Sequence, residues 1–389
     1  MKHISVVDRS GADEVIASST LPQFKVYTHK DLANIPQLKS LPGATLFDMK
    51  VVSSILPFRV NQYVIENLID WANIPDDPLY QLTFPQKGMV PPALYQQMAQ
   101  LIEQDAPREQ IQALATKLRT QLNPQPNGQL EMNVPLDRNG RRLNGLQHKY
   151  RETVLFFPTQ GQTCHSYCTF CFRWAQFVGD EDLRMASTDT AELHTYLAEH
   201  PAVSDLLVTG GDPMVMKTRH LAALLKPLTE QRFAHVRTVR LGTKALTFWP
   251  QRFVNDSDAP ELLDLLTHLV KAGKHVAIMA HFNHWREMDT PIARSAIELL
   301  RKTGVEIRSQ GPVLAHINDS ADVWAKTWGM QVKAGIIPYY MFVERDTGAK
   351  QYFEIPLAKA WMIYRNAVSQ LSGLGRTARG PVMSASPGK

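Results

Sequence analysis

The C-terminal two-thirds of this 389-residue chain alternates between short β-rich runs and helical runs, and no other feature restricts the fold as strongly. Each of six β-rich runs is followed by a segment whose apolar residues recur with helical spacing. The six runs are TVLFF (153–157), DLLVTGGD (205–212), TVRLGT (238–243), HVAIMAHFNH (275–284), VEIRSQGPVL (305–314) and IIPYYMFV (336–343). Alternation of this kind is typical of a parallel sheet with helical crossovers.

Several predicted strands end in glycine or in a polar residue, namely Gly210, Gly242, His281 and Gln310. In a barrel of parallel strands, the carboxyl ends of the strands form the active face. An open doubly wound sheet is the alternative, but the G-x-G-x-x-G that usually follows its first strand is absent from the sequence. We therefore predict an α/β fold with a partial (β/α)6, TIM-like barrel.

The first part of the chain has a different pattern. Helical apolar spacing recurs in KDLANIPQLKSL (30–41), VNQYVIENLIDWAN (60–73) and the long stretch 91–122, and NPQPNGQL (123–130) then breaks it. We expect a mostly helical N-terminal region over residues 1–145, followed by the barrel over residues 146–389.

Composition excludes some classes of function. The formal charge is +5, but lysine and arginine are scattered without a run of five or six, so nucleic-acid binding has little support. No stretch approaches the ~20 apolar residues that span a bilayer, and the first residues lack the apolar core of a secretory signal. Because only three cysteines occur and they are clustered, a reducing compartment is expected, and we predict a cytoplasmic protein.

All three cysteines lie in TCHSYCTFCFRW (163–174), directly after the first predicted strand. Cys164, Cys168 and Cys171 have the spacing C-x3-C-x2-C. Three thiolates can bind three irons of a four-iron cluster and leave one iron open to a non-protein ligand. A zinc site would need a fourth ligand, for which only the adjacent His165 is at hand. Three inert buried thiols are the remaining alternative.

The C-x3-C-x2-C spacing resembles the radical SAM superfamily, in which S-adenosylmethionine (SAM) chelates the open iron. Further motifs resemble the lysine 2,3-aminomutase family within that superfamily. They are NIPDDPLYQLTFP (73–85), GLQHKY (145–150), CTFCFR (168–173), LLVTGGD (206–212), HFNH (281–284), VLAHIND (313–319) and IPYYMFV (337–343). The resemblance covers most of the chain from about residue 60, and the family's core is a partial (β/α)6 barrel.

The resemblance implies a [4Fe-4S] cluster, SAM and pyridoxal 5'-phosphate as cofactors. A 5'-deoxyadenosyl radical would start the transfer of an amino group from the α- to the β-carbon of an amino acid. Gly210, Gly211 and Asp212 of the TGGD turn are then expected near SAM, because glycine allows a close approach, together with His281 and Gln310. Taken alone, these residues would be ordinary turn or strand-end residues.

The resemblance also implies that pyridoxal phosphate is bound covalently by Lys389, the last residue of SASPGK (384–389). Lys149 and Tyr150 would contact its phosphate. The family's run of four glycines before this lysine is reduced here to Gly388, and a lysine at the end of a chain is ordinarily a solvated charge. The cysteines that bind zinc near the C-terminus of some relatives are absent.

Two arginines bear on the substrate. By resemblance, Arg173 binds the substrate α-carboxylate, a task that suits the two-pronged guanidinium. Arg345 stands where the lysine-specific enzymes have an aspartate for the distal ammonium. Because such a charge reversal would reverse the preferred ligand, we hypothesise an acidic, glutamate-like substrate. The alternatives are a structural ion pair of Arg345 with Glu344, Asp346 or Glu354, and a neutral or lysine substrate.

Two other functions are also compatible with the sequence. One is a radical SAM enzyme of another reaction class that lacks pyridoxal phosphate, and another is a non-enzymatic iron–sulfur or zinc protein. The family implies a low-potential electron donor of the flavodoxin or ferredoxin type, a small-molecule amino-acid substrate, and a homo-oligomer.

Overall fold

A computed structural model describes residues 24–123, 133–178 and 185–383. Its centre is one eight-stranded sheet in the order β10-β9-β8-β7-β6-β5-β4-β3. The strands are β3 Leu146–Tyr150, β4 Thr153–Phe156, β5 Asp205–Val208, β6 Thr238–Thr243, β7 His275–His281, β8 Glu306–Val313, β9 Ile337–Val343 and β10 Arg379–Val382. All neighbours pair in parallel except β3 and β4, which are antiparallel.

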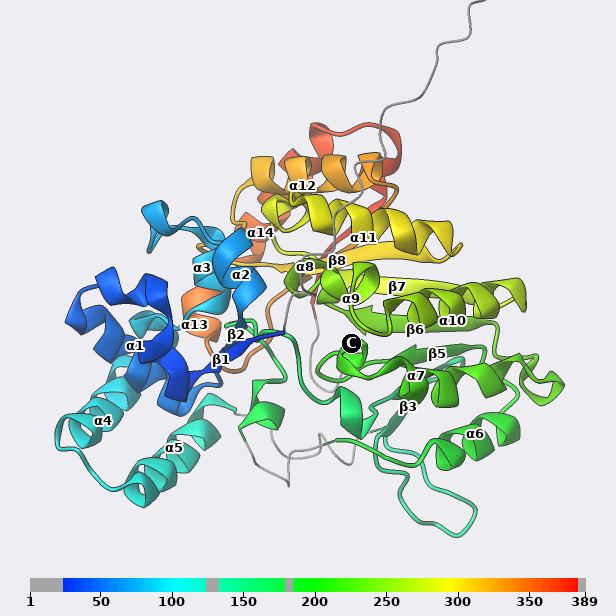
Figure 1. Cartoon of the computed structure of the whole chain (residues 1–389), viewed down its shortest axis with the longest axis horizontal. Coiled ribbons are helices and arrows are strands. Elements are labelled where there is room, and N and C mark those ends of the chain that lie inside the picture. Colours follow the sequence, from blue (N-terminus) through cyan, green and yellow to red (C-terminus); the bar gives the residue numbers. More distant parts are fainter. Residues whose placement is uncertain (1–23, 124–132, 179–184, 384–389) are drawn as a thin grey trace, which may run out of the picture.

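The six predicted strand-then-helix units are all present, which confirms the α/β fold. Each strand from β4 to β9 is followed by a crossover helix that covers the outer face of the curved sheet (Figure 1). These helices are α6 Thr190–Glu199, α7 Thr218–Leu225, α10 Ala259–Lys271, α11 Pro291–Lys302, α12 Ala321–Lys333 and α14 Leu357–Ser369, and the short helices α8 Ala245–Phe248, α9 Gln251–Val254 and α13 Lys350–Phe353 lie in connections. The sheet is not closed among the described residues, since β3 and β10 do not pair with each other.

Two strands of the eight-stranded sheet were missed in the sequence. The four-residue β10 extends the parallel set by pairing with β9, and its glycine and proline weaken any strand pattern. Strand β3 forms an antiparallel edge beside β4.

The crossover helices have the signals that start them in the sequence. Asp189 Oδ1 accepts hydrogen bonds from Ala191 N (2.8 Å) and Glu192 N (3.0 Å) at the start of α6. Thr290 caps α11, whose first residue is Pro291. Strand β7 has five consecutive buried residues, as expected for a parallel strand that is covered on both faces.

The N-terminal region is mostly helical, as expected, but contains a small antiparallel sheet. Its elements are β1 Val26–Thr28, α1 Gly43–Ile55, β2 Arg59–Asn61, α2 Gln62–Asn67, α3 Pro78–Thr83, α4 Pro92–Glu103 and α5 Arg108–Leu122. The run 30–41, predicted as one helix, instead contains most of one 3₁₀ helix, His29–Asn34, and a second one, Pro36–Ser40, with an extended Ile35 between them. Pro36 disfavours helical backbone at the residue before it, which breaks the predicted helix.

The N-terminal region shares a hydrophobic core with the mouth of the barrel. This core joins residues of α1, α3 and α4 to Phe170 and Trp174 of the cysteine segment and to Phe353 of α13. A second core lies between the sheet and helices α6 to α11. Figure 1 shows the N-terminal helices gathered at one end of the sheet. The cysteine segment is therefore packed from the N-terminal side.

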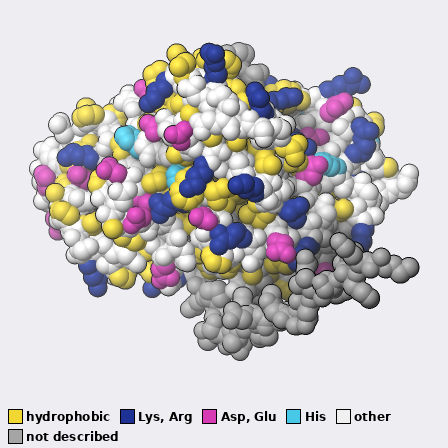
Figure 2. Space-filling model, turned by 90° about the horizontal axis from the view of Figure 1, so that it is seen from above, with side chains coloured by type: hydrophobic (Ala, Val, Ile, Leu, Met, Phe, Trp, Pro, Cys, Tyr) yellow, Lys and Arg dark blue, Asp and Glu magenta, His cyan; other side chains and the backbone are white. Residues whose placement is uncertain are grey.

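Two observations concern the surface. No helix within the described ranges is long and apolar enough to cross a membrane. On the face shown in Figure 2, lysine and arginine side chains are interspersed with acidic and apolar ones and do not form one continuous basic surface.

Candidate active site

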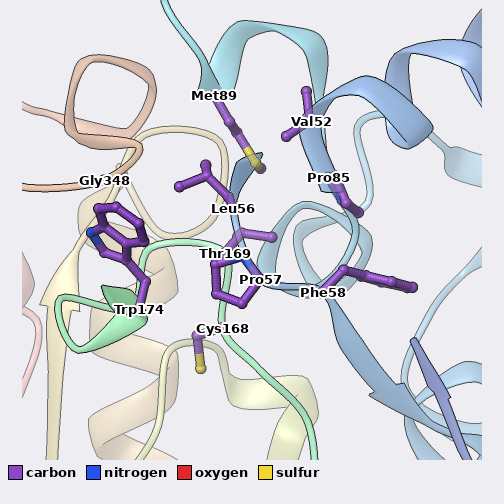
Figure 3. Close-up of a pocket in the computed structure, with 10 residues that line it drawn as sticks. All are labelled: Val52, Leu56, Pro57, Phe58, Pro85, Met89, Cys168, Thr169, Trp174 and Gly348. Carbon is purple, nitrogen blue, oxygen red and sulfur yellow. The ribbon is translucent and has the colours of Figure 1, made fainter. Parts of the chain in front are cut away.

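The cysteine loop follows the carboxyl end of β4, as predicted. Cys164, Cys168 and Cys171 are half-buried and none forms a disulfide. Two tight turns bring the segment together, because Cys171 N donates to Cys168 O (3.1 Å) and Trp174 N donates to Cys171 O (3.1 Å). In Figure 3 the Cys168 sulfur points away from the labelled apolar side chains. The thiol therefore faces the barrel side of the loop.

The other side of the loop borders a small apolar pocket. It is lined by Val52, Leu56, Pro57, Phe58, Pro85, Met89, Cys168, Thr169, Trp174 and Gly348. The N-terminal region supplies the first six of these residues, so it forms the largely apolar side of the pocket next to Cys168 (Figure 3). Burial raises the pKa of the Cys171 thiol to about 11 and raises the pKa values of Cys164 and Cys168 further. Without a metal these groups are neutral thiols, and metal binding would deprotonate them.

The donor set fits an iron–sulfur cluster better than a zinc ion. Across the described residues, no group of three or more His, Cys, Asp or Glu side chains could surround a single metal ion. His165, the fourth ligand of the zinc alternative, is buried and stacks against Trp249 with ring centroids 6.5 Å apart. Burial lowers the pKa of its imidazole to about 3. A cluster needs only one thiolate on each of three separate irons.

The TGGD turn fits tightly against the cysteine loop. A Cβ on Gly210, whose φ is +146°, would lie 2.2 Å from Gln162 Nε2, and a Cβ on Gly211 would lie 2.4 Å from Thr163 O. We expected these glycines to make room for a ligand. The described residues give a different reason, which is that the loop before Cys164 occupies the space where the Cβ atoms would be.

Asp212 is a structural anchor of the same turn. Its carboxylate accepts hydrogen bonds from Met214 N (2.9 Å), Thr243 Oγ1 (2.7 Å) and Lys244 N (2.8 Å). Burial raises the pKa of Asp212 to about 6, while these hydrogen bonds oppose the rise. Asp212 thus ties the end of β5 to the end of β6.

A buried ion pair continues this network, and the sequence interpretation missed it. Lys244 Nζ donates to Glu287 Oε1 (2.6 Å) and Asn283 Oδ1 (2.9 Å). Glu287 Oε2 accepts from Asn283 N (2.5 Å) and His284 N (2.9 Å). The sequence feature that could have revealed this ion pair is a charged residue, Lys244, directly after the predicted strand TVRLGT. The pair fixes the loops that follow β6 and β7.

His281 and Gln310, which were both predicted to lie beside SAM, occupy adjacent positions on neighbouring strands. His281 pairs with Gln310 across β7 and β8, and Gln310 pairs with Tyr340 across β8 and β9. The His281 ring lies 6.1 Å from the ring of Phe170, which stands between two of the cysteines. His281 Nδ1 is buried without a hydrogen-bond partner, and burial lowers the pKa of the ring to about 3. A neutral imidazole whose buried Nδ1 has no partner among the described residues is suited to contact a polar cofactor such as SAM.

Arg173 and Arg345 lie on the same aromatic side chain. Their guanidinium carbons are 5.4 Å and 4.1 Å from the ring centroid of Phe172, and Arg173 is also 4.5 Å from the ring of Phe157. Burial and the nearby charge of Arg345 lower the pKa of Arg173 to about 10, and burial also lowers the pKa of Arg345. Neither guanidinium has a carboxylate within 4.0 Å among the described side chains.

The predicted phosphate contacts lie elsewhere. Tyr150 pairs with Thr153, the first residue of β4, because β3 is antiparallel to β4. Lys149 and Tyr150 are exposed and stand at the opposite end of the sheet from the cysteine loop. Lys389 lies outside the described residues. The described part of the chain therefore does not assemble a pyridoxal phosphate pocket from these three residues.

Three proteins with similar sequences are L-lysine 2,3-aminomutases, one of them putative. The chain is 30% identical over 361 residues to a putative L-lysine 2,3-aminomutase of Aquifex aeolicus, which covers 92% of this chain and 83% of that protein. It is 30% identical to the L-lysine 2,3-aminomutase of Acetoanaerobium sticklandii over 70% of this chain and 62% of that protein. It is also 31% identical to the Bacillus subtilis L-lysine 2,3-aminomutase over 59% of this chain and 45% of that protein. No family model matches.

Among solved structures, the chain is similar to a radical SAM methyltransferase from Sphaerobacter thermophilus, with 12% identity, a TM-score of 0.41 and coverage of 75% of this chain and 93% of that one. It is also similar to SuiB of Streptococcus suis bound to S-adenosylmethionine, with 12% identity, a TM-score of 0.39 and coverage of 69% and 56%. The Aquifex relative, matched over most of both chains, decides the family, and the predicted [4Fe-4S] cluster, SAM and pyridoxal phosphate agree with it. This chain belongs to the lysine 2,3-aminomutase family of radical SAM isomerases.

Proposed function

We propose that the chain is a 2,3-aminomutase whose substrate is an acidic amino acid such as glutamate. The observation that carries the proposal is that the guanidiniums of Arg173 and Arg345 lie 5.4 Å and 4.1 Å from the ring centroid of Phe172 and that neither pairs with a carboxylate among the described residues. Two neighbouring cations repel each other, and Arg173 is half-buried, so an anionic ligand would stabilise both. Glutamate offers two carboxylates, one for each guanidinium.

The structural alternative for Arg345 has less support. Asp346 and Glu354 both pair with Lys350, at 3.3 Å and 3.5 Å. Both carboxyl oxygens of Glu344 are buried without a hydrogen-bond partner. Burial raises the pKa of Glu344 to about 9, so this group is neutral at pH 7. None of these carboxyls neutralises Arg345.

The same residues disfavour lysine as the substrate. A distal ammonium that reaches the end of β9 would meet Arg345, a neutral Glu344, and an Asp346 already paired with Lys350. Uncompensated like charges in such a site repel and lose hydration. An ammonium would therefore bind here far less well than a carboxylate.

The other predicted site residues would hold the cofactors. Cys164, Cys168 and Cys171 would hold the cluster, and His281, Gln310, Gly210 and Gly211 would border SAM. When bound, SAM and the cluster supply the radical that abstracts hydrogen from the substrate, and the chain holds the reactants in place and excludes water. Pyridoxal phosphate on Lys389 is proposed from family resemblance, and Lys149 and Tyr150 are left out of its contacts because they lie at the opposite end of the sheet.

The test compares substrates and a charge series at one position. Anaerobically reconstituted full-length protein with SAM, dithionite and pyridoxal phosphate is offered glutamate, aspartate, lysine or alanine, and β-amino acid and 5'-deoxyadenosine are quantified by mass spectrometry. We expect β-glutamate from glutamate and no product from lysine. In Arg345→Gln, kcat/KM for glutamate should fall about 10²-fold, which corresponds to about 2.7 kcal/mol of lost charged hydrogen bonding.

The matched control is Arg294→Gln, which removes an exposed arginine that pairs with Asp289 at 2.9 Å. It should leave kcat/KM unchanged. β-Lysine formed from lysine at a higher kcat/KM than glutamate would refute the acidic substrate. SAM cleavage without a β-amino acid from any of the four would instead favour a radical SAM reaction of another class.

A further inference from the structure

The N-terminal strand β2 holds the segment between the first two cysteines. Tyr167 N donates to Arg59 O (2.8 Å), and Asn61 N donates to Ser166 Oγ (3.0 Å). The Asn61 side chain extends this contact, because its Nδ2 donates to His165 O (3.4 Å) and also to Phe248 O (2.7 Å) at the end of α8. Residues 165–167 therefore rest on a strand that belongs to the N-terminal region, outside the barrel sheet.

The Arg59 side chain adds an unmatched charge at this point. Its Nε is buried and has no hydrogen-bond acceptor, and no carboxylate forms an ion pair with it among the residues that the structure describes. Arg59 O accepts from Tyr167 N, and Tyr167 lies between Cys164 and Cys168 in the sequence, so Arg59 stands directly beside the cysteine loop. A guanidinium left unpaired in a partly buried position needs an anionic partner.

The other cations near the cysteines differ from Arg59. Lys244 is neutralised by Glu287 at 2.6 Å. Arg173 lies two residues after Cys171 and is assigned above to the substrate carboxylate. Arg59 is left as a cation beside the cysteine loop that no carboxylate of the described residues and no proposed substrate group neutralises.

We propose that Arg59 is a charge-balancing residue for the iron–sulfur cluster, so that the N-terminal region is part of the redox site. Each one-electron reduction adds a negative charge to a cluster already held by three thiolates. A fixed guanidinium nearby favours the more negative, reduced form through Coulomb attraction, which is strong where water is excluded. The inference concerns the cluster alone and does not depend on which amino acid is the substrate.

The test is the reduction potential of the cluster, measured without substrate. Full-length protein is reconstituted anaerobically as wild type, Arg59→Met, Arg59→Lys and Lys117→Met, the last being a charge removal on exposed α5. The reduced cluster is followed by electron paramagnetic resonance during a mediated redox titration, after iron and sulfide have been assayed. We expect the reduced-to-oxidised ratio at a fixed potential to fall about tenfold in Arg59→Met, a shift of about 59 mV for one electron.

The charge-conserving and remote variants should stay close to the wild type, within about twofold in that ratio. A wild-type potential in Arg59→Met, or an equal shift in Arg59→Lys and Arg59→Met, would overturn the proposal. If Arg59→Met fails to hold iron, Arg59→Gln is compared with Arg59→Lys by the same titration. Equal potentials, or loss of iron from both, would then assign Arg59 a purely structural role.

Discussion

Replacing Glu287 by glutamine should destabilise the barrel strongly, although the two side chains have nearly the same volume. The carboxylate is fully buried and its partner Lys244 is 9% exposed, so both charges depend on each other for compensation. Glu287→Gln removes the counter-ion of Lys244. Both carboxylate oxygens of Glu287 accept hydrogen bonds, one from Lys244 Nζ and the other from the backbone N–H groups of residues 283 and 284. In the variant, the amide N–H₂ of glutamine would face one of these two sets of donors.

The size of the effect follows from these contacts. Breaking a buried ion pair by removing one partner typically costs about 3–5 kcal/mol, because the remaining charge stays buried. The amide oxygen of glutamine can still accept from either Lys244 or the two backbone N–H groups, so the charged hydrogen bonds, each worth about 1.5–3 kcal/mol, are not added to this figure. We therefore expect the free energy of unfolding to fall by about 3–5 kcal/mol.

Urea denaturation of anaerobically prepared full-length protein, followed by circular dichroism, measures this change. The matched control is Glu298→Gln, which breaks the exposed i,i+4 pair with Lys302 at 2.8 Å and should cost less than about 1 kcal/mol. The double variant Lys244→Met/Glu287→Leu should recover part of the loss, because neither charge is then left buried alone. A loss below about 1 kcal/mol in Glu287→Gln would refute this account of the network.

Three further changes test other parts of the structure. Burial raises the pKa of Glu344 from 4.5 to about 9, so between pH 5 and 8 the folded chain holds one more proton than the unfolded chain, and its free energy of unfolding falls by about 1.4 kcal/mol per pH unit as pH rises. Glu344→Gln should remove this slope, and parallel urea-derived profiles for variant and wild type would contradict the assignment. Gly211→Ala should lower the iron content after reconstitution, because the new Cβ would lie 2.4 Å from Thr163 O, and full iron content would show that the loop yields. Asn61→Asp should lower stability by about 2 kcal/mol or more, since a carboxylate would replace the donor to Phe248 O, and an unchanged melting temperature would count against that contact.

Much of the barrel could be predicted from the sequence because local pattern and global fold agree there. The parallel strands are short apolar runs that are easy to recognise, most clearly β7 with its five consecutive buried residues, and the cysteine spacing lies in one continuous loop. Both features are local. A reader of the sequence needs no information about distant contacts to find them.

The site residues that depend on contacts between distant parts of the chain were harder to predict. Arg59 lies in a three-residue strand within a helical region, and only its contact with Tyr167, more than a hundred residues away, makes it notable. The place of Tyr150 depends on the direction of β3, which no residue pattern specified. Lys244 was visible as a charge after a strand, but its partner Glu287 lies in another loop.

The shared core between the N-terminal region and the cysteine loop has a consequence for the chain in air. Cys168 packs against that core, whereas the sheet and helices α6 to α11 enclose a separate one. Regions with their own core open in separate cooperative steps. Partial opening of the N-terminal helices would expose the cluster to oxygen while the sheet stays folded, so the rate of oxidative damage should follow amide hydrogen exchange in α1 and α4 and not the global stability.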